Sequence, residues 1–277
     1  MDRTEYTGIM NSRKIQARRE RDARYAQLQE EGRVWGHIPR EWIRQLVFPR
    51  LEKADLQFLR SYADTCAVAD ILDTWGLRGA ISASQLSPVA PGQKIVGQAV
   101  TQRNLPTRET VTQGLLDHAY IGMNTKEIGY LAEAGDVLVV DNSGAPDVSC
   151  LGGMACRGYQ QRGIAGAVVW GGVRDISSIR KDGFPVWSRG QTCVTGKYRI
   201  FAAEINGPVA VAAVTIWPGD LIVADDSGVC AVPLDRVPPL MEKLRQSLTD
   251  EKKMRAMIDS GTPLEEIRRA DRAHYGK

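Results

Sequence analysis

The stretch that decides the fold is RGIAGAVVWGGVRD, residues 162–175. It holds an apolar run, Ile164–Trp170, which is followed by a glycine pair and then by Arg174 and Asp175. A second apolar run, VLVV at residues 137–140, lies upstream between a Gly-Asp turn and an aspartate. Continuous apolar runs of this length, bounded by turn residues, are typical of strands buried on both faces. The sequence therefore predicts a sheet with buried, parallel strands at its centre.

Outside these two strands, the spacing of apolar residues alternates between helical and strand-like periods. Helices are expected over residues 63–75, 123–132, 152–162 and 176–181, and strands over residues 94–101, 184–187, 208–216, 221–224 and 229–232. Strands that alternate with helices, followed by consecutive strands, predict a mixed α/β sandwich.

The expected organisation is one compact domain with a helical extension at each end. Residues 1–58 form the N-terminal helical arm, residues 59–235 the α/β core, and residues 236–277 the C-terminal helical extension. Within the arm, residues 11–31 are rich in strong helix formers but poor in apolar residues, which favours a solvated arm or an oligomer strap. Residues 38–58 are expected to form amphipathic helices that join this arm to the core.

Composition limits the classes of partner. The chain has 277 residues, of which 43% are hydrophobic and 25% charged, so a substantial core is expected. Its formal net charge is only +3, which gives no electrostatic case for a nucleic-acid partner. No apolar run reaches the roughly 18–20 residues of a membrane helix, and the charged start lacks a signal-peptide segment. Five scattered cysteines do not suggest a disulfide framework, so we expect a cytoplasmic protein without a membrane partner.

Several familiar catalytic motifs do not occur in the sequence. There is no GxSxG motif, and His118 is the only histidine between the two helical extensions. The glycines around Gly152 lack the Lys-Ser/Thr of a phosphate-binding loop and the spacing of a dinucleotide fingerprint. Cys150 and Cys156 flank these glycines and are interpreted as packed residues rather than nucleophiles.

A ligand site is expected where the buried strands end. Gly152 and Gly153 lie at the predicted start of a helix, where unpaired N–H groups suit a carboxylate, although taken alone they are better explained by a tight turn without a ligand. Arg174 and Asp175 follow the next buried strand, the edge at which open α/β sheets bind ligands. Taken alone, Asp175 fits an N-cap and Arg174 a surface ion pair. Together these residues indicate a pocket for an anionic ligand and for a hard cation such as Mg²⁺.

Five blocks in order carry a family resemblance. They are GDVLVVD (135–141), LGG (151–153), RGIAGAVVWGGVRD (162–175), DGFPVW (182–187) and PGDLIVADDSGVCAVP (218–233). With them the chain resembles the family of RraA-like proteins and class II pyruvate aldolases, which includes the 4-hydroxy-4-methyl-2-oxoglutarate aldolases. The resemblance covers roughly residues 60–265, and the first 58 residues extend beyond it.

The resemblance implies an α/β/β/α sandwich like a swivelling phosphohistidine-type domain. It also implies a homotrimer or homohexamer whose active sites lie between subunits. By this resemblance Asp175 is the direct ligand of Mg²⁺ or Mn²⁺, and Arg174 contacts the carbonyl oxygen that becomes an enolate. The amides of Gly152, Gly153, Met154 and Ala155 form the cradle for the substrate carboxylate.

One position departs from the family pattern. The aldolase motif places an acidic residue 21 positions before the arginine, where this chain has Gly153. By resemblance, a further metal-site carboxylate comes from a C-terminal helix of the neighbouring subunit, and Glu251 is the best match. Equally well, Glu251 is only an exposed helix residue that pairs with Arg255 at i,i+4. Asp141 and Asp147 are two other carboxylates that lie near the same loop.

The function implied is a divalent-metal-dependent aldolase that cleaves a 4-hydroxy-2-oxo di- or tricarboxylic acid to pyruvate through a metal-stabilised enolate. The same enolate arises from oxaloacetate, so a decarboxylase side activity is expected. Two alternatives stay open. One is a non-catalytic RraA-type regulator that binds an RNA-processing enzyme, and the other is a related metal-dependent lyase or hydrolase for a different acid. The retained Asp175 favours the enzyme.

Overall fold

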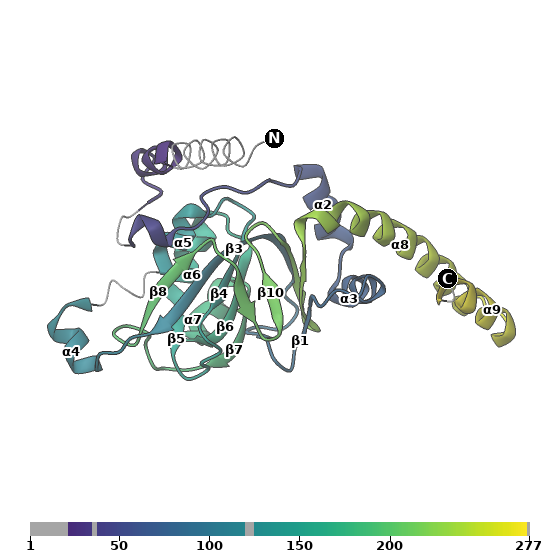
Figure 1. The fold of residues 1–277 in the computed structure, drawn as a ribbon. Helices are drawn as coiled ribbons and strands as arrows, with labels where there is room; N and C mark the ends of the chain where they lie inside the picture. Colours follow the sequence, from purple (N-terminus) through teal and green to yellow (C-terminus); the bar gives the residue numbers. More distant parts are fainter. Residues whose placement is uncertain (1–21, 35–37, 120–124, 276–277) are drawn as a thin grey trace, which may run out of the picture.

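The computed structural model describes residues 22–34, 38–119 and 125–275, and helical residues 22–30 come first (Figure 1). The helices that follow are η1 Arg40–Trp42, α2 Lys53–Tyr62, α3 Thr65–Thr74, α4 Val111–Leu116, α5 Thr125–Leu131, α6 Gly153–Gln161, α7 Ile176–Asp182, η3 Leu234–Arg236, α8 Val237–Asp259 and α9 Leu264–Tyr275. The strands are β1 Ala80–Ser82, β2 Ser87–Pro88, β3 Ile95–Pro106, β4 Val137–Asp141, β5 Ser149–Leu151, β6 Gly166–Val173, β7 Val186–Gln191, β8 Ile200–Ile205, β9 Val209–Val211, β10 Val214–Ile216, β11 Leu221–Asp225 and β12 Gly228–Val232.

Ten strands form one sheet with a parallel half and an antiparallel half. The order is β1-β12-β11-β3-β4-β6-β7-β2, and β5 pairs with β6 while β8 pairs with β3. Strands β3, β4, β6 and β7 run parallel, whereas β1, β12, β11 and β3 alternate in direction. Strands β9 and β10 form a separate hairpin. The two predicted central strands are therefore confirmed, and they are parallel neighbours in the sheet.

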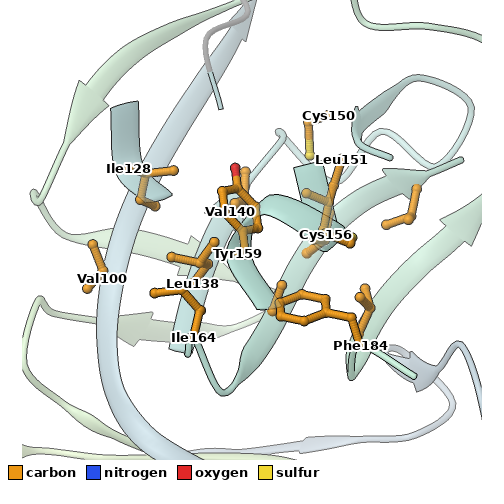
Figure 2. Packing of buried hydrophobic residues seen from close by; sticks show 14 of the residues in the cluster. Val100, Ile128, Leu138, Val140, Cys150, Leu151, Cys156, Tyr159, Ile164 and Phe184 are labelled. Carbon is orange, nitrogen blue, oxygen red and sulfur yellow. The ribbon is translucent and has the colours of Figure 1, made fainter. Parts of the chain in front are cut away.

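The central strands are apolar throughout because both of their faces are buried. Val137 and Val139 of β4 pack into an inner cluster together with β9–β12. Leu138 and Val140 point the other way, into a cluster with α5, α6 and α7 (Figure 2). Successive side chains of a strand point to opposite faces, so a strand between two apolar layers has no polar face.

The clusters define four layers. The inner cluster joins residues of the parallel half to residues of the antiparallel half, such as Val168 to Ile222. Helices α5, α6 and α7 cover the outer face of the parallel half. Helices α2, α3 and α8 cover the outer face of the antiparallel half, through residues such as Leu59, Val68 and Leu240. The predicted α/β/β/α sandwich with N- and C-terminal helices is thus confirmed.

The segment before α2 differs from the prediction. Of residues 38–58, only Arg40–Trp42 and the start of α2 are helical, so the expectation of amphipathic helices is wrong for most of this range. Pro49 lacks an N–H and disfavours the helical conformation in the residue before it. The core instead satisfies this backbone, because the Gln98 side chain accepts from Leu51 N at 2.9 Å and donates to Pro49 O at 3.0 Å.

The two ends of the described chain pack differently. Leu28, from helical residues 22–30, is 1% exposed and lies in a cluster with Leu131 and Ile205 of the sandwich. In α8 the last fully buried residue is Leu244, and the rest of the helix leads away from the body to α9 (Figure 1). None of the helices in residues 22–34, 38–119 and 125–275 combines the length and apolar character needed to cross a bilayer. The expectations for residues 1–21 lie outside the described residues.

Candidate functional site

The register of two strands places the predicted site residues side by side. Strand β5 pairs with the end of β6, with Leu151 opposite Val173. The amide of Arg174 donates to the carbonyl of Leu151 at 3.0 Å, which continues this pairing by one residue. The next residue on the β5 side is Gly152, immediately before α6. The sequence-distant elements LGG and VRD therefore meet at the carboxyl edge of the parallel strands, where ligands bind in such sheets.

Gly152 leaves space for two side chains that lie directly against its backbone. A Cβ atom at Gly152 would lie 2.8 Å from Oδ2 of Asp175 and 3.1 Å from both Cγ and Nε of Arg174. Contacts this short force the neighbouring groups to move. The glycine therefore allows the guanidinium and the carboxylate to lie directly against the backbone at the start of α6.

Asp175 is held in an unusual conformation. Its φ of 60° and ψ of 38° are left-handed, which few residues other than glycine adopt. It occupies the N-cap position of α7, yet its side chain makes no hydrogen bond with that helix. Oδ2 instead accepts from the amide of Gly153 at 3.1 Å, and Nε of Arg174 lies 3.5 Å from the same oxygen. The alternative of a simple N-cap for α7 does not hold, because Asp175 is turned toward α6.

The predicted cradle is partly occupied by the chain itself. Within Gly152, Gly153, Met154 and Ala155, the amide of Gly153 donates to Asp175, and that of Ala155 donates to Gly152 O at 3.1 Å. A helix leaves the N–H groups of its first turn without an intrahelical partner, which applies to Met154. The Met154 side chain is 83% exposed, so it does not block access to these amides. A cavity of about 140 Å³ lies between α5 and α6 and is lined in part by Met154, Ala155 and Tyr130, but not by the Arg-Asp pair.

The charges at this edge are mixed. The side chains of Arg174 and Asp175 are 37% and 43% exposed, so both reach solvent. Further along the two helices, Arg157 of α6 lies 3.5 Å from Asp182, the last residue of α7. The start of α6 adds the positive end of a helix dipole. An anionic ligand would thus meet one guanidinium and those α6 amides that the chain leaves unpaired, such as that of Met154, with a single carboxylate beside them.

The second predicted metal ligand is not at this site in one chain. Glu251 is exposed on α8, where it forms an ion pair with Arg255 at 2.6 Å. The body of α8 packs on the antiparallel half, whereas α6 and α7 cover the parallel half. Among the residues that the structure describes, no group of three or more His, Cys, Asp and Glu side chains forms a metal cage. The contribution of Glu251 from a neighbouring subunit remains a prediction.

The donor set can still hold a hard cation. Oδ2 of Asp175 is used by Gly153 and Arg174, and Oδ1 stays available on a side chain that reaches solvent. Mg²⁺ commonly takes one or two protein carboxylates and keeps several waters. The residues present therefore fit Mg²⁺ or Mn²⁺ with Asp175 as the one protein ligand from this chain.

The buried acidic and thiol groups near the loop are packed or hydrogen-bonded within the fold. Asp141 is buried and accepts from the amides of Ser143 and Ala210 at 2.9 and 3.4 Å, so it fastens β9 to the end of β4. Asp147 is exposed on the loop that follows. Burial raises the pKa of the Cys150 thiol to about 12 and also raises that of Cys156. Neither cysteine is therefore a ready thiolate, in agreement with their interpretation as packed residues.

One neighbour of the site was missed in the sequence. Ser178 lies one turn after Asp175 in α7, and its Cβ would be 3.1 Å from a Cβ atom at Gly153. Its spacing of three residues from Asp175, at the start of a predicted helix, is the signal that would have indicated it.

The fold and the site together define a helix–sheet–sheet–helix protein in which an Arg-Asp pair at the edge of the parallel strands lies against a Gly-Gly helix start. Residues 65–231 match the family described as "RraA-like: Aldolase/RraA". The chain belongs to this family.

Individual relatives span both branches of the family. The chain is 30% identical over 214 residues, 76% of its length and 93% of the relative's, to a Halalkalibacterium halodurans protein provisionally named 4-hydroxy-4-methyl-2-oxoglutarate aldolase. The chain is also 33% identical over 205 residues to Protein DlpA of Legionella pneumophila. This match covers 74% of the present chain but only 32% of DlpA. A crystal structure of Streptomyces coelicolor RraAS2, titled an unusual member of the RNase ES inhibitor RraA family, is similar with a TM-score of 0.64 and 28% identity, covering 76% of this chain and 99% of RraAS2.

Proposed function

We propose that this protein is a divalent-metal-dependent aldolase that cleaves a 4-hydroxy-2-oxo di- or tricarboxylic acid and releases pyruvate. The observation that carries the proposal is the placement of Arg174 and Asp175 against the start of α6, for which Gly152 leaves the space. The names of relatives such as the H. halodurans protein support the same reaction class.

Each residue has a chemical task in this proposal. The amides at the start of α6 that have no partner in the chain, such as that of Met154, bind the carboxylate of the 2-oxo acid, helped by the positive end of the helix dipole. Arg174 donates hydrogen bonds to the neighbouring keto oxygen, on which negative charge develops as the carbon–carbon bond breaks. Asp175 would hold Mg²⁺ or Mn²⁺, and a bound cation would supply further positive charge at that oxygen. The hydrogen bond from Gly153 fixes the orientation of the Asp175 carboxylate.

The first experiment measures pyruvate release from 4-hydroxy-4-methyl-2-oxoglutarate and from oxaloacetate, with Mg²⁺, with Mn²⁺ and with EDTA. The wild-type protein should need the metal. Arg174→Ala and Asp175→Asn should each lower kcat/KM by about 100-fold or more, the usual loss when a group that stabilises the transition-state charge is removed. Arg157→Ala is the matched control, because it removes an arginine that pairs with Asp182 on the same two helices.

The control should keep wild-type activity. Unchanged pyruvate release in Arg174→Ala and Asp175→Asn would show that the roles are assigned wrongly. Turnover of a different oxo acid with the same dependence on Asp175 would instead favour a related lyase or hydrolase.

The second candidate is a non-catalytic regulator of an RNA-processing enzyme. It is favoured by Gly153, which stands where the aldolase pattern has an acidic residue, and by the similarity to RraAS2. A regulator would inhibit a purified RNase E-type ribonuclease in a direct assay and would turn over no oxo acid. Inhibition that persists in Asp175→Asn would place the regulatory surface away from the metal site.

A further inference from the structure

The position opposite Gly153 is taken by a serine. A Cβ atom on Gly153 would lie 3.1 Å from Cβ of Ser178 and 3.2 Å from Cβ of Asp175. Both distances are tighter than ordinary van der Waals contact, so the start of α6 and the first turn of α7 are closed against each other at this point. Ser178 therefore fills the space that a side chain from residue 153 would need.

The hydroxyl of Ser178 belongs to a side chain that begins next to Gly153 at the start of α6. It is one bond from the Cβ atom that faces Gly153, and the residue is exposed. The Cβ atoms of Asp175 and Ser178 lie 3.2 and 3.1 Å from the Cβ position of Gly153, so the two side chains begin on the same side of the start of α6. A ligand that contacts both the α6 amides and Asp175 would meet this hydroxyl.

A neutral hydrogen-bond donor at residue 178 suits an anionic ligand better than a second carboxylate would. Oδ2 of Asp175 is already shared by the Gly153 amide and Arg174. A second carboxylate at this point would add an oxygen ligand for a cation, but it would repel an anionic ligand oxygen. A hydroxyl can donate to that oxygen instead.

We propose that Ser178 is a specificity-determining residue, whose hydroxyl donates a hydrogen bond to an anionic oxygen of a bound 2-oxo acid. The inference rests on the proposed function. The inference adds a property of the substrate. The site accepts acids that place an anionic oxygen next to Ser178, because residue 178 is neutral and residue 153 has no side chain.

The test separates the cation from the anion. The free Mn²⁺ signal in electron paramagnetic resonance gives the affinity for Mn²⁺, and calorimetry at saturating Mn²⁺ gives the affinity for oxalate. Ser178→Asp should bind Mn²⁺ about threefold more tightly and oxalate about tenfold more weakly, as expected for one added charge near the surface. Ser178→Ala should weaken oxalate about fivefold through the lost hydrogen bond, with little change for Mn²⁺.

The control is Ser177→Asp. It adds the same charge to the first turn of α7, about 100° further round the helix. Because acidic residues suit the first turn of a helix, both aspartate variants should fold. Ser177→Asp should leave both affinities within about twofold of the wild type.

Equal effects of the two aspartate variants, shifts of both ligands in the same direction, or a wild-type protein that binds no oxalate would each overturn the role of Ser178. A wild-type protein that releases pyruvate but shows no Ser178 effect keeps the proposed function and rejects this inference. If the Mn²⁺ and oxalate affinities shift in opposite directions but the wild-type protein releases no pyruvate, the 2-oxo acid site is supported and the aldolase activity is rejected.

Discussion

At the residue scale, Asp175 shows how neighbours decide the task of a side chain. Its position in the sequence predicts an N-cap, because it immediately precedes a helix. Its left-handed backbone turns the carboxylate to Gly153 instead. Backbone conformations of this kind cost on the order of 1–3 kcal/mol and persist only where the surroundings hold them, which is common at functional sites.

Asp220 carries a prediction of pH-dependent stability at the same scale. Burial raises the pKa of this carboxyl group to about 6, although it accepts from the amides of Trp217 and Leu234. An exposed aspartate has a pKa of about 3.9, so between these two values the folded protein binds more protons than the unfolded chain. The contribution of Asp220 to stability is therefore most favourable below pH 4, and it falls as the pH rises to 6.

Asp220→Asn removes this charge, so the variant should gain stability relative to the wild type as the pH rises. The measurement is the difference in Tm between variant and wild type at pH 4.5, 5.5 and 7.5. Asp73→Asn, exposed on α3, removes an equal charge and should show no such trend. A difference in Tm that is constant across the three pH values would contradict the raised pKa of Asp220.

At the element scale, two glycines of α6 and its N-cap differ in the space around them. Gly152 precedes the helix and is crossed by Asp175 and Arg174, whereas a Cβ atom at Gly158, inside the helix, would meet no atom within 4 Å. Gly152→Ala should therefore weaken oxalate binding at saturating Mn²⁺ about tenfold, because it displaces both site residues. Gly158→Ala should leave binding intact and raise the free energy of unfolding by roughly 0.5–1 kcal/mol.

Calorimetry and urea unfolding of the two variants provide the check. Because both substitutions add one methyl group to the same element, each serves as the control of the other. If Gly152→Ala binds oxalate as tightly as Gly158→Ala does, the close packing of Arg174 and Asp175 at the start of α6 is irrelevant to the ligand.

At the scale of the whole molecule, the C-terminal helices carry the prediction about assembly. Burial in α8 ends at Leu244, and Glu251 lies beyond it with Arg255 as its partner. If Glu251 completes the site of a neighbouring subunit, Glu251→Gln and Arg174→Ala should each be inactive alone. Mixed oligomers should then regain part of the activity, because some sites receive an intact residue from each chain.

The complementation is measured as pyruvate release after co-expression of two differently tagged chains, with light scattering to establish a trimer or a hexamer. Arg255→Gln, which removes the helical partner of Glu251, is the control and should stay active. Activity in Glu251→Gln alone would leave this residue as one half of an exposed i,i+4 pair.

How far the sequence predicts this molecule depends on the range of the interactions involved. Local and periodic information is enough for β4, β6 and the helix at Ile176, because a strand between two apolar layers must be apolar along its length. It is also enough to place Arg174 and Asp175 at a strand end. It fails for residues 43–52, whose backbone is satisfied by distant partners such as Gln98 and so needs no helix.

By itself, the sequence determined the α/β class, the buried parallel strands and the family blocks, since each follows from residue types over short stretches. Only the tertiary structure decided which atoms meet at the site: that Asp175 bonds Gly153 rather than its own helix, that Ser178 faces Gly153, and that Glu251 lies on α8, whose buried part packs on the other half of the sandwich. These contacts join residues from different elements, and their distances depend on strand register and helix packing, which no single stretch of sequence encodes.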